Sequence, residues 1–331
     1  MLVFVLFVLG FVLLVYGANW LVDGAASIAK KRGISNVVIG LTIVAMGTST
    51  PELVVNVIAS LSGAHDVAMG NVLGSNISNI LLILGISAVI YPLVVHVNHG
   101  YKKIKFGFEI PIAILGAIII GIMANDHLIT GSGNSEISRW NGIVLVLFFL
   151  AYLAYTFKFA NNGNDDDLEV KLLPVWKSVF LVPLGIGSMA LGGHWIVDGA
   201  VEIAGIFGMS EAIISLTIVA VGTSLPELAT SVAAAIKKNP GIAVGNIVGS
   251  NIFNVFFILG ISAIVSPIRF NPVMNFDILV ALFTTVLLFM FMFIQKPNVL
   301  QRWQGATMVF LYVVYVAVLV LNETGTINLG F

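Results

Sequence analysis

Two short stretches of this sequence place a carboxylate, hydroxyls, a glycine and a proline inside long apolar runs. The first is Gly-Thr-Ser-Thr-Pro-Glu from Gly47 to Glu52, and the second is Gly-Thr-Ser-Leu-Pro-Glu from Gly222 to Glu227. An ionisable side chain at membrane depth is costly and usually faces a cavity or an ion pathway. The glycine and proline loosen the helix, so that backbone carbonyls can turn toward a ligand. Two such breaks, one in each half of the chain, indicate a transport site at the bilayer midplane.

A second polar cluster follows each break. It has the form Gly-Ser-Asn-x-x-Asn and runs from Gly74 to Asn79 and again from Gly249 to Asn254. Residues four apart on a helix share one face. The pairs with this spacing are Thr48 with Glu52, Thr223 with Glu227, Ser75 with Asn79, and Ser250 with Asn254. We expect these four faces to converge around one centre.

All of the candidate ligands are hard oxygens, from carboxylates, hydroxyls, amides and freed backbone carbonyls. Such a set suits calcium, sodium or magnesium and disfavours softer transition metals. Two glutamates neutralise one divalent cation, which lowers the cost of holding it in a medium of low dielectric constant. Magnesium prefers rigid octahedral sites that keep bound water, so a flexible cage of many oxygens favours calcium. The chain has no cysteine, and thiolate metal sites and disulfides are therefore excluded.

The composition is that of an integral membrane protein. Of the 331 residues, 59% are hydrophobic and 9% are charged, and the mean hydropathy is +1.05, whereas soluble domains carry about 25% charged residues. Apolar stretches long enough to cross about 30 Å of hydrocarbon as helices fall at 2–22, 36–61, 68–92, 106–124, 140–159, 175–200, 210–236, 242–268, 275–294 and 303–322. We therefore predict an all-α protein of ten transmembrane helices in the lipid bilayer, with no separate soluble domain.

The chain is an internal repeat. A shift of 175 residues aligns Trp20 with Trp195, Glu52 with Glu227 and Asn79 with Asn254 without a gap. Five helices per copy force the second copy to enter the membrane from the opposite side, which predicts two inverted repeats. We place the first repeat at 1–160, a short cytoplasmic linker at 161–171 and the second repeat at 172–331. The first apolar segment belongs to the repeat, so we expect it to be retained rather than cleaved as a signal peptide.

The positive charges give an orientation. With both termini outside, 13 of the 15 lysines and arginines fall in cytoplasmic loops, and only Arg139 and Arg269 lie on the outer side. This asymmetry is a strong positive-inside signal. The linker contains three consecutive aspartates, Asp165 to Asp167, but it lacks the loop pattern of a calcium-binding hand, and we interpret it as a flexible connector.

The paired Gly-Thr-Ser-x-Pro-Glu and Gly-Ser-Asn-x-x-Asn motifs, in two five-helix repeats, closely resemble the alpha repeats of the sodium/calcium exchangers within the calcium/cation antiporter superfamily. The resemblance covers essentially the whole chain. The chain is similar to a compact prokaryotic member of the family. It implies an antiporter of the plasma membrane, multi-pass and not an enzyme, that exports calcium electrogenically against sodium by alternating access. The first helix of each repeat would slide against the rest. Calcium and sodium would be the transported ions, with no cofactor, no nucleic-acid partner and no obligatory protein partner.

The same resemblance implies roles for individual residues. Glu52 and Glu227, with the backbone carbonyls of Thr48 and Thr223, would form the calcium site. Asn79 and Asn254 would lie at its middle, close to both glutamates. The flanking sodium sites would use Ser49, Ser75 and the Ala45 carbonyl in one half, and Ser224, Ser250 and the Ala220 carbonyl in the other. Potassium-dependent relatives have an aspartate at the position of Asn254, so its absence here argues against potassium co-transport.

Other interpretations of these residues remain open. The nearest alternative is a proton-coupled calcium/cation antiporter of the same superfamily; an intramembrane hydrolase with two carboxylates and a selective channel are further ones. The glutamates could also be buried structural carboxylates. Asp23 and Asp198 are interpreted as helix-end or interfacial residues. For Asn71, Asn76, Asn246 and Asn251 we favour interhelical hydrogen bonds over ion ligation.

Overall fold

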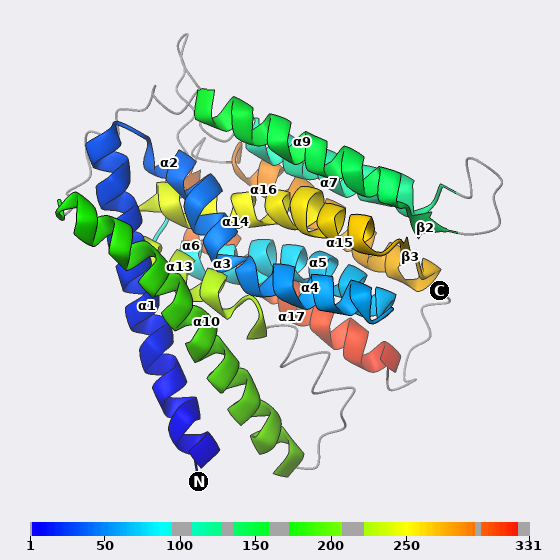
Figure 1. Ribbon diagram of the computed structural model, residues 1–331, viewed down its shortest axis with the longest axis horizontal. Coiled ribbons are helices and arrows are strands. Elements are labelled where there is room, and N and C mark those ends of the chain that lie inside the picture. Colours follow the sequence, from blue (N-terminus) through cyan, green and yellow to red (C-terminus); the bar gives the residue numbers. More distant parts are fainter. Residues whose placement is uncertain are drawn as a thin grey trace.

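The protein is a bundle of long helices (Figure 1). The computed structural model describes residues 2–94, 108–126, 135–158, 172–206, 222–294 and 299–323. In the first half the helical segments are α1 (Leu2–Arg32), α2 (Asn36–Ile39), η1 (Gly40–Val44), α3 (Ala45–Thr48), α4 (Thr50–Leu61), α5 (His65–Ser78), η2 (Asn79–Leu84), α6 (Gly85–Ile90), α7 (Glu109–Ala124) and α9 (Arg139–Lys158). In the second half they are α10 (Val175–Ile206), α13 (Leu225–Ile236), α14 (Pro240–Ile252), η5 (Phe253–Ile258), α15 (Leu259–Val265), η6 (Pro272–Met274), α16 (Asn275–Phe291) and α17 (Arg302–Glu323).

The helices are long and apolar enough for a membrane protein. Within the described ranges, seven pass the length and hydropathy requirements for a membrane span. The bent pair 36–48 and 50–61 would make an eighth span, and α7 and α13 are shorter apolar helices. The all-helical class is thus confirmed, apart from two short antiparallel strand pairs. The count of ten spans stays a prediction.

Those strand pairs connect the two halves. β1 (Leu93–Val94) pairs with β4 (Val299–Leu300), and β2 (Glu136–Ile137) pairs with β3 (Ile268–Arg269). Each pair therefore joins a connection of the first half to a connection of the second.

Two sequence-based boundaries were wrong. The first predicted span, 2–22, continues as helix to Arg32, and 175–200 continues to Ile206. Asp23 and Asp198 consequently lie inside helices rather than at helix ends. Asp198 is exposed and lies 3.4 Å from His194 one turn away, and Asp23 is partly exposed and pairs with Lys237 at 2.7 Å. A charge that reaches solvent or a partner does not end a helix. The linker 161–171 lies outside the described residues.

The two Gly-Thr-Ser-x-Pro-Glu stretches interrupt helices at equivalent serines. Ser49 has φ −84° and ψ 11°, and Ser224 has φ −89° and ψ 8°. A proline in the first turn follows each serine, where its missing N–H leaves no hydrogen bond unmade. In the first half this break bends the span by 47°. The predicted interruption is confirmed at Ser49, and at Ser224 the structure describes a turn before α13, while residues 207–221 lie outside the described residues.

Three π-helical segments lie beside these breaks. η1 precedes Thr48 by one turn, η2 begins at Asn79, and η5 includes Asn254. Such segments are frequent at functional sites, because the wider turn changes the direction in which side chains and carbonyls point. Both asparagines of the predicted site are therefore on locally widened helix.

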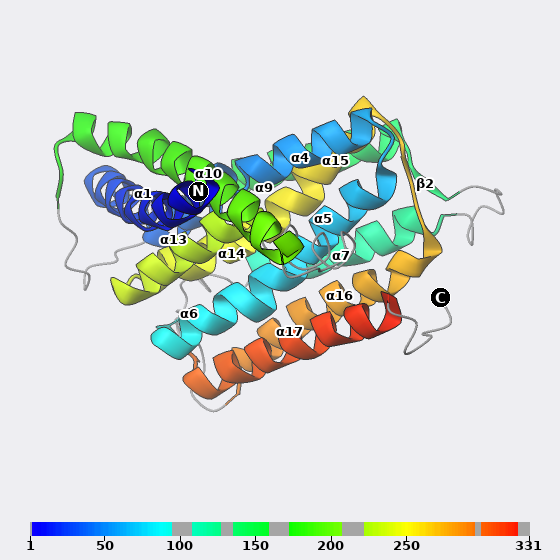
Figure 2. The ribbon, with the colours of Figure 1, turned by 90° about the horizontal axis from the view of Figure 1, so that it is seen from below.

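α1 and α10 pack against each other at one edge of the molecule and run obliquely to the other helices (Figure 1). Figure 2 shows the same pair from below. Glycines bring the two backbones into contact: a Cβ added at Gly17 would lie 2.8 Å from the Gly185 carbonyl oxygen, and one added at Gly10 would lie 2.7 Å from that of Gly192. Close approach through small residues is the usual way membrane helices associate.

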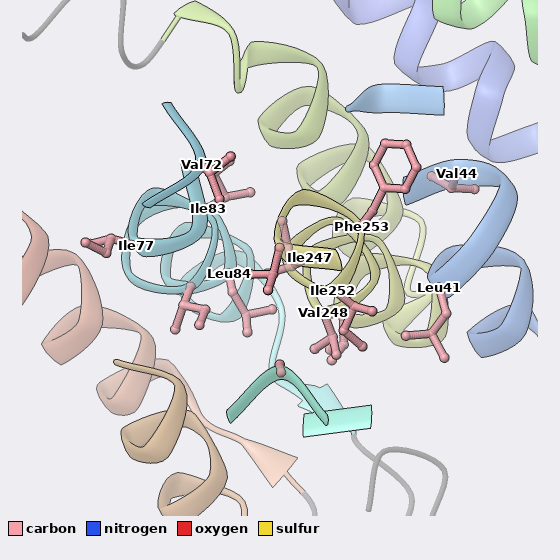
Figure 3. Close-up of a cluster of buried hydrophobic side chains, with 14 of the residues drawn as sticks. Leu41, Val44, Val72, Ile77, Ile83, Leu84, Ile247, Val248, Ile252 and Phe253 are labelled. Carbon is pink, nitrogen blue, oxygen red and sulfur yellow. The ribbon is translucent and has the colours of Figure 1, made fainter. Parts of the chain in front are cut away.

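The core lies where the middle helices of both halves meet. Buried side chains from η1, α5, η2, α14 and η5 lie there, including Leu41, Val72, Leu84, Ile247 and Phe253 (Figure 3). This packing holds the broken helices and the Gly-Ser-Asn-x-x-Asn helices together, and thereby positions the polar residues among them.

Candidate cation site

Glu52 and Glu227 are buried at the starts of α4 and α13. Their exposed fractions are 1% and 0%. Each lies in the first turn of its helix, where the helix dipole stabilises a negative charge. In both residues Oε2 is buried and accepts no hydrogen bond from the described residues. Two carboxylate oxygens are therefore available to a cation.

The serines at the helix breaks reach across to the glutamate of the other half. Ser49 Oγ donates to Glu227 Oε1 at 2.7 Å and lies 3.0 Å from Ser250 Oγ. Ser224 Oγ approaches Glu52 Oε1 at 3.5 Å, the upper limit of a hydrogen bond. Glu227 is thus held more tightly than Glu52. The sodium sites had been expected to group Ser49 with Ser75, whereas the structure brings Ser49 to Ser250.

Asn79 and Asn254 each use their amide nitrogen within the protein. Asn79 Nδ2 donates to Asn251 Oδ1 at 3.0 Å, and Asn254 Nδ2 donates to Asn76 Oδ1 at 3.1 Å. Their Oδ1 atoms are buried and have no hydrogen-bond donor among the described residues, and the same is true of Ser75 Oγ. A buried amide oxygen normally has a donor, so these oxygens are suited to a metal ion.

Asn71 and Asn246 contact the backbone of the two glutamates. Asn71 Nδ2 donates to Asn56 Oδ1 at 2.6 Å and approaches the Glu52 carbonyl at 3.4 Å. Asn246 Nδ2 makes the equivalent contacts, to Ser231 Oγ at 3.0 Å and to the Glu227 carbonyl at 3.4 Å. These asparagines thus make the interhelical hydrogen bonds expected of them, and the preference for this role over ion ligation stays a prediction.

Sequence reasoning missed Asn56 and Ser231. Both are fully buried, and each lies four residues after a site glutamate. The available signal was that the two positions are equivalent in the repeat and polar in both copies. It was overlooked because an asparagine and a serine do not match as identical residues.

The threonine and alanine carbonyls were expected to bind ions, and the structure describes only some of these positions. Thr48 Oγ1 donates to Asn246 Oδ1 at 3.0 Å and lies 3.2 Å from the Ala45 carbonyl oxygen, which also accepts the Ser49 backbone N–H at 3.0 Å. The Ala45 carbonyl therefore stays within the helical hydrogen-bond pattern. Thr223 is half-buried, and Ala220 lies outside the described residues. Ligation by the threonine and alanine carbonyls stays a prediction.

The arrangement as a whole fits a hard cation. Two carboxylate oxygens and two amide oxygens are buried without donors, at equivalent positions of the two halves. Hard ions such as calcium and sodium bind carboxylate and carbonyl oxygens of this kind. With both glutamates ionised the cluster carries two negative charges, and an uncompensated buried charge of that size would be strongly unfavourable.

Comparison with known proteins identifies the family to which the chain belongs. The model of the sodium/calcium exchanger protein family matches residues 2–158 and 177–321. The chain belongs to the sodium/calcium exchanger family. It is 31% identical to the sodium/calcium exchanger MaX1 of Methanosarcina acetivorans, over 96% of this chain and 98% of MaX1. It is 36% identical to the inner membrane protein YrbG of Escherichia coli, over 81% of each chain.

A solved structure of the sodium-calcium exchanger NCX_Mj, soaked with zero Na⁺ and Ca²⁺, has the same architecture. It superposes with a TM-score of 0.80 at 34% identity, covering 96% of this chain and 99% of that chain. The family is one of transporters, and this exchanger-family chain is accordingly a multi-helix membrane protein.

Proposed function

We propose that this chain is a secondary antiporter that exchanges sodium for calcium across the membrane. The observation that carries the proposal is the set of four buried oxygens without donors, on Glu52, Glu227, Asn79 and Asn254. Family membership supports the same conclusion. Sodium and calcium compete for these oxygens, because both ions take the same hard ligands and their joint occupancy would leave excess positive charge in a buried site.

Ser49, Ser75, Ser224 and Ser250 are proposed to supply the flanking sodium ligands. The support is the distance of 3.0 Å between Ser49 Oγ and Ser250 Oγ, together with the unpartnered Ser75 Oγ. A cation bound by two hydroxyls needs their oxygens close together, and Ser49 and Ser250 meet this requirement. The carbonyls of Ala45, Ala220, Thr48 and Thr223 complete the proposed ligand set.

We propose alternating access as the mechanism, and the packing of α1 and α10 supports it. These helices form one closely packed pair, and α10 contacts both breaks at their glycines: Ile186 packs on Gly47, and Val197 packs on Gly222. The glycines of α1 and α10 join the two helices to each other, so we propose that they slide as a unit. Access to the site changes side as the pair moves along the breaks.

Two inverted five-helix repeats, 1–160 and 172–331, are the proposed architecture. Reciprocal contacts support it: Asn76 bonds to the backbone of Asn251 and Asn251 to that of Asn76, while Ser49 reaches Glu227 and Ser224 reaches Glu52. Contacts that exchange the halves are those of a two-fold arrangement. We further propose ten spans in the plasma membrane with both termini outside, in line with the positive charges.

The function is tested by calcium uptake into liposomes loaded with sodium and diluted into sodium-free buffer. Uptake of radioactive calcium is expected only with the outward sodium gradient and not in a sodium-equilibrated control. Uptake that ignores sodium but follows an imposed pH gradient would replace sodium with protons as the coupling ion. Uptake without any counter-gradient, as through a channel, would contradict antiport altogether.

A further inference from the structure

We propose that Asn76 and Asn251 are positioning residues that aim the oxygens of Asn79 and Asn254 at the transported ion. The inference rests on the proposed function, because it takes Asn79 and Asn254 as ligands. An asparagine amide has an oxygen on one side and a nitrogen on the other, and only the oxygen binds a cation. Something must therefore fix which side of each amide faces the site.

The orientation of Asn251 is fixed by a backbone carbonyl. Asn251 Nδ2 donates to the Asn76 carbonyl oxygen at 3.2 Å. A carbonyl can only accept a hydrogen bond, so the nitrogen of Asn251 must face it. The opposite side of the Asn251 amide, Oδ1, is thereby presented as an acceptor.

This acceptor in turn fixes Asn79. Asn79 Nδ2 donates to Asn251 Oδ1 at 3.0 Å. If the Asn79 amide turned over, two oxygens would face each other and this hydrogen bond would be lost. The remaining atom, Asn79 Oδ1, is the buried oxygen without a donor. A backbone carbonyl thus determines, through one amide, where the ligand oxygen of the next amide points.

The other half contains the same chain of contacts with the halves exchanged. Asn76 Nδ2 donates to the Asn251 carbonyl at 3.4 Å, and Asn76 Oδ1 accepts from Asn254 Nδ2 at 3.1 Å. Asn76 and Asn251 are buried, with exposed fractions of 7% and 3%, so bulk water does not compete for these bonds. Two independent relays therefore cross between the halves, Asn251 to Asn79 and Asn76 to Asn254.

The relays make a pairwise prediction. Asn251→Ala and Asn76→Ala should each raise the KM for calcium about 10–100-fold, the usual effect of removing a group that orients a metal ligand. Asn79→Ala and Asn254→Ala should raise it at least as much. The double variants Asn251→Ala/Asn79→Ala and Asn76→Ala/Asn254→Ala should be little worse than their ligand single variants, because no ligand remains to be aimed. In the crossed double variants, Asn251→Ala/Asn254→Ala and Asn76→Ala/Asn79→Ala, the fold-increases in KM of the two single variants should multiply.

The measurement is the KM for calcium of the full-length protein in sodium-loaded liposomes, together with equilibrium binding of radioactive calcium to the purified variants. KM does not depend on how much protein is reconstituted, so a lower yield of one variant does not change it. The two relays make the same prediction at equivalent positions, so each serves as a check on the other. Asn125→Ala is the matched control. Asn125 and Asn275 donate amide hydrogen bonds to each other, at 2.7 and 3.1 Å, between the end of α7 and the start of α16. Loss of this amide pair should leave the KM for calcium unchanged.

The outcomes separate the two levels of the proposal. If Asn79→Ala and Asn254→Ala leave the KM for calcium unchanged, these residues are not ligands, and both the assigned site and the relay fail. If they raise it but Asn251→Ala and Asn76→Ala do not, the site stands and the relay is overturned. The relay is equally overturned if all four double variants multiply, because a general packing role would not distinguish the partner of each amide.

Discussion

Glu52 and Glu227 are the residues on which the ion chemistry depends most directly. Each presents one buried oxygen without a donor, and each contributes half of the negative charge of the site. Glu52→Gln or Glu227→Gln should therefore reduce calcium transport by roughly 30-fold or more, the effect of removing one partner from a buried charge pair. Calcium flux in liposomes is the measurement. Glu202→Gln, at an exposed position of α10, is the control, and near-normal flux in either site variant would remove that glutamate from the site.

Asn254 leads to a prediction about potassium. A neutral amide at this position leaves the cluster with two carboxylates, one fewer than an aspartate would give. We expect the same rate of sodium-driven calcium uptake with and without potassium on either side of the membrane. A strict potassium requirement in vesicles would show that the missing carboxylate does not decide the co-transported ion.

At the scale of residues, the sequence singled out polar side chains that lie in the core, but not the contacts that they make with one another. Spacing placed Thr48 with Glu52 and Ser75 with Asn79, because it describes single helices. The contacts of Ser49 with Glu227 and of Asn79 with Asn251 join opposite halves. Linear spacing carries no information about such contacts, whereas the tertiary packing of the two broken helices determines them.

α1 and α10 are the elements that should move together. Ser178 Oγ donates to Ser27 Oγ at 3.0 Å and joins the two helices, whereas the ion pair of Asp23 with Lys237 at 2.7 Å joins α1 to the end of α13. Cross-linking Asp23→Cys to Lys237→Cys with a reducible thiol reagent should stop transport, and reduction should restore it. Cross-linking Ser27→Cys to Ser178→Cys should leave transport intact.

This pair of cross-links distinguishes sliding from a fixed scaffold, and the chain has no native cysteine to interfere. Full transport with the first pair cross-linked would contradict movement of α1 past α13. Loss of transport with only the second pair cross-linked would indicate that α1 and α10 move relative to each other.

Within the described ranges, the apolar stretches of the sequence mostly coincide with helices, because the bilayer sets the length and apolarity of a spanning helix. They failed at the ends of α1 and α10, which continue past Asp23 and Asp198. The π-helical segments at Asn79 and Asn254 were not foreseen. A one-residue widening of a helix leaves the apolar pattern almost unchanged, so hydropathy does not report it.

The orientation of the whole molecule is testable through its charges. Lys31→Cys and Lys238→Cys, both at exposed positions, should react with an impermeant maleimide only from the cytoplasmic side. Arg139→Cys should react only from outside, because the positive-inside rule places that arginine on the other face. Labelling of Lys31→Cys and Lys238→Cys from outside, with Arg139→Cys labelled from inside, would reverse the orientation of both termini.

The central claim is that sodium and calcium compete for one buried set of oxygens shared by the two halves. Equilibrium binding of radioactive calcium to the purified protein, titrated with sodium, measures this directly. Sodium should displace calcium completely, with a steep dependence on concentration because several sodium ions replace one calcium ion. Glu52→Gln and Glu227→Gln should each abolish the displaceable binding. Calcium binding that sodium does not reduce, or that survives in both variants, would contradict the account.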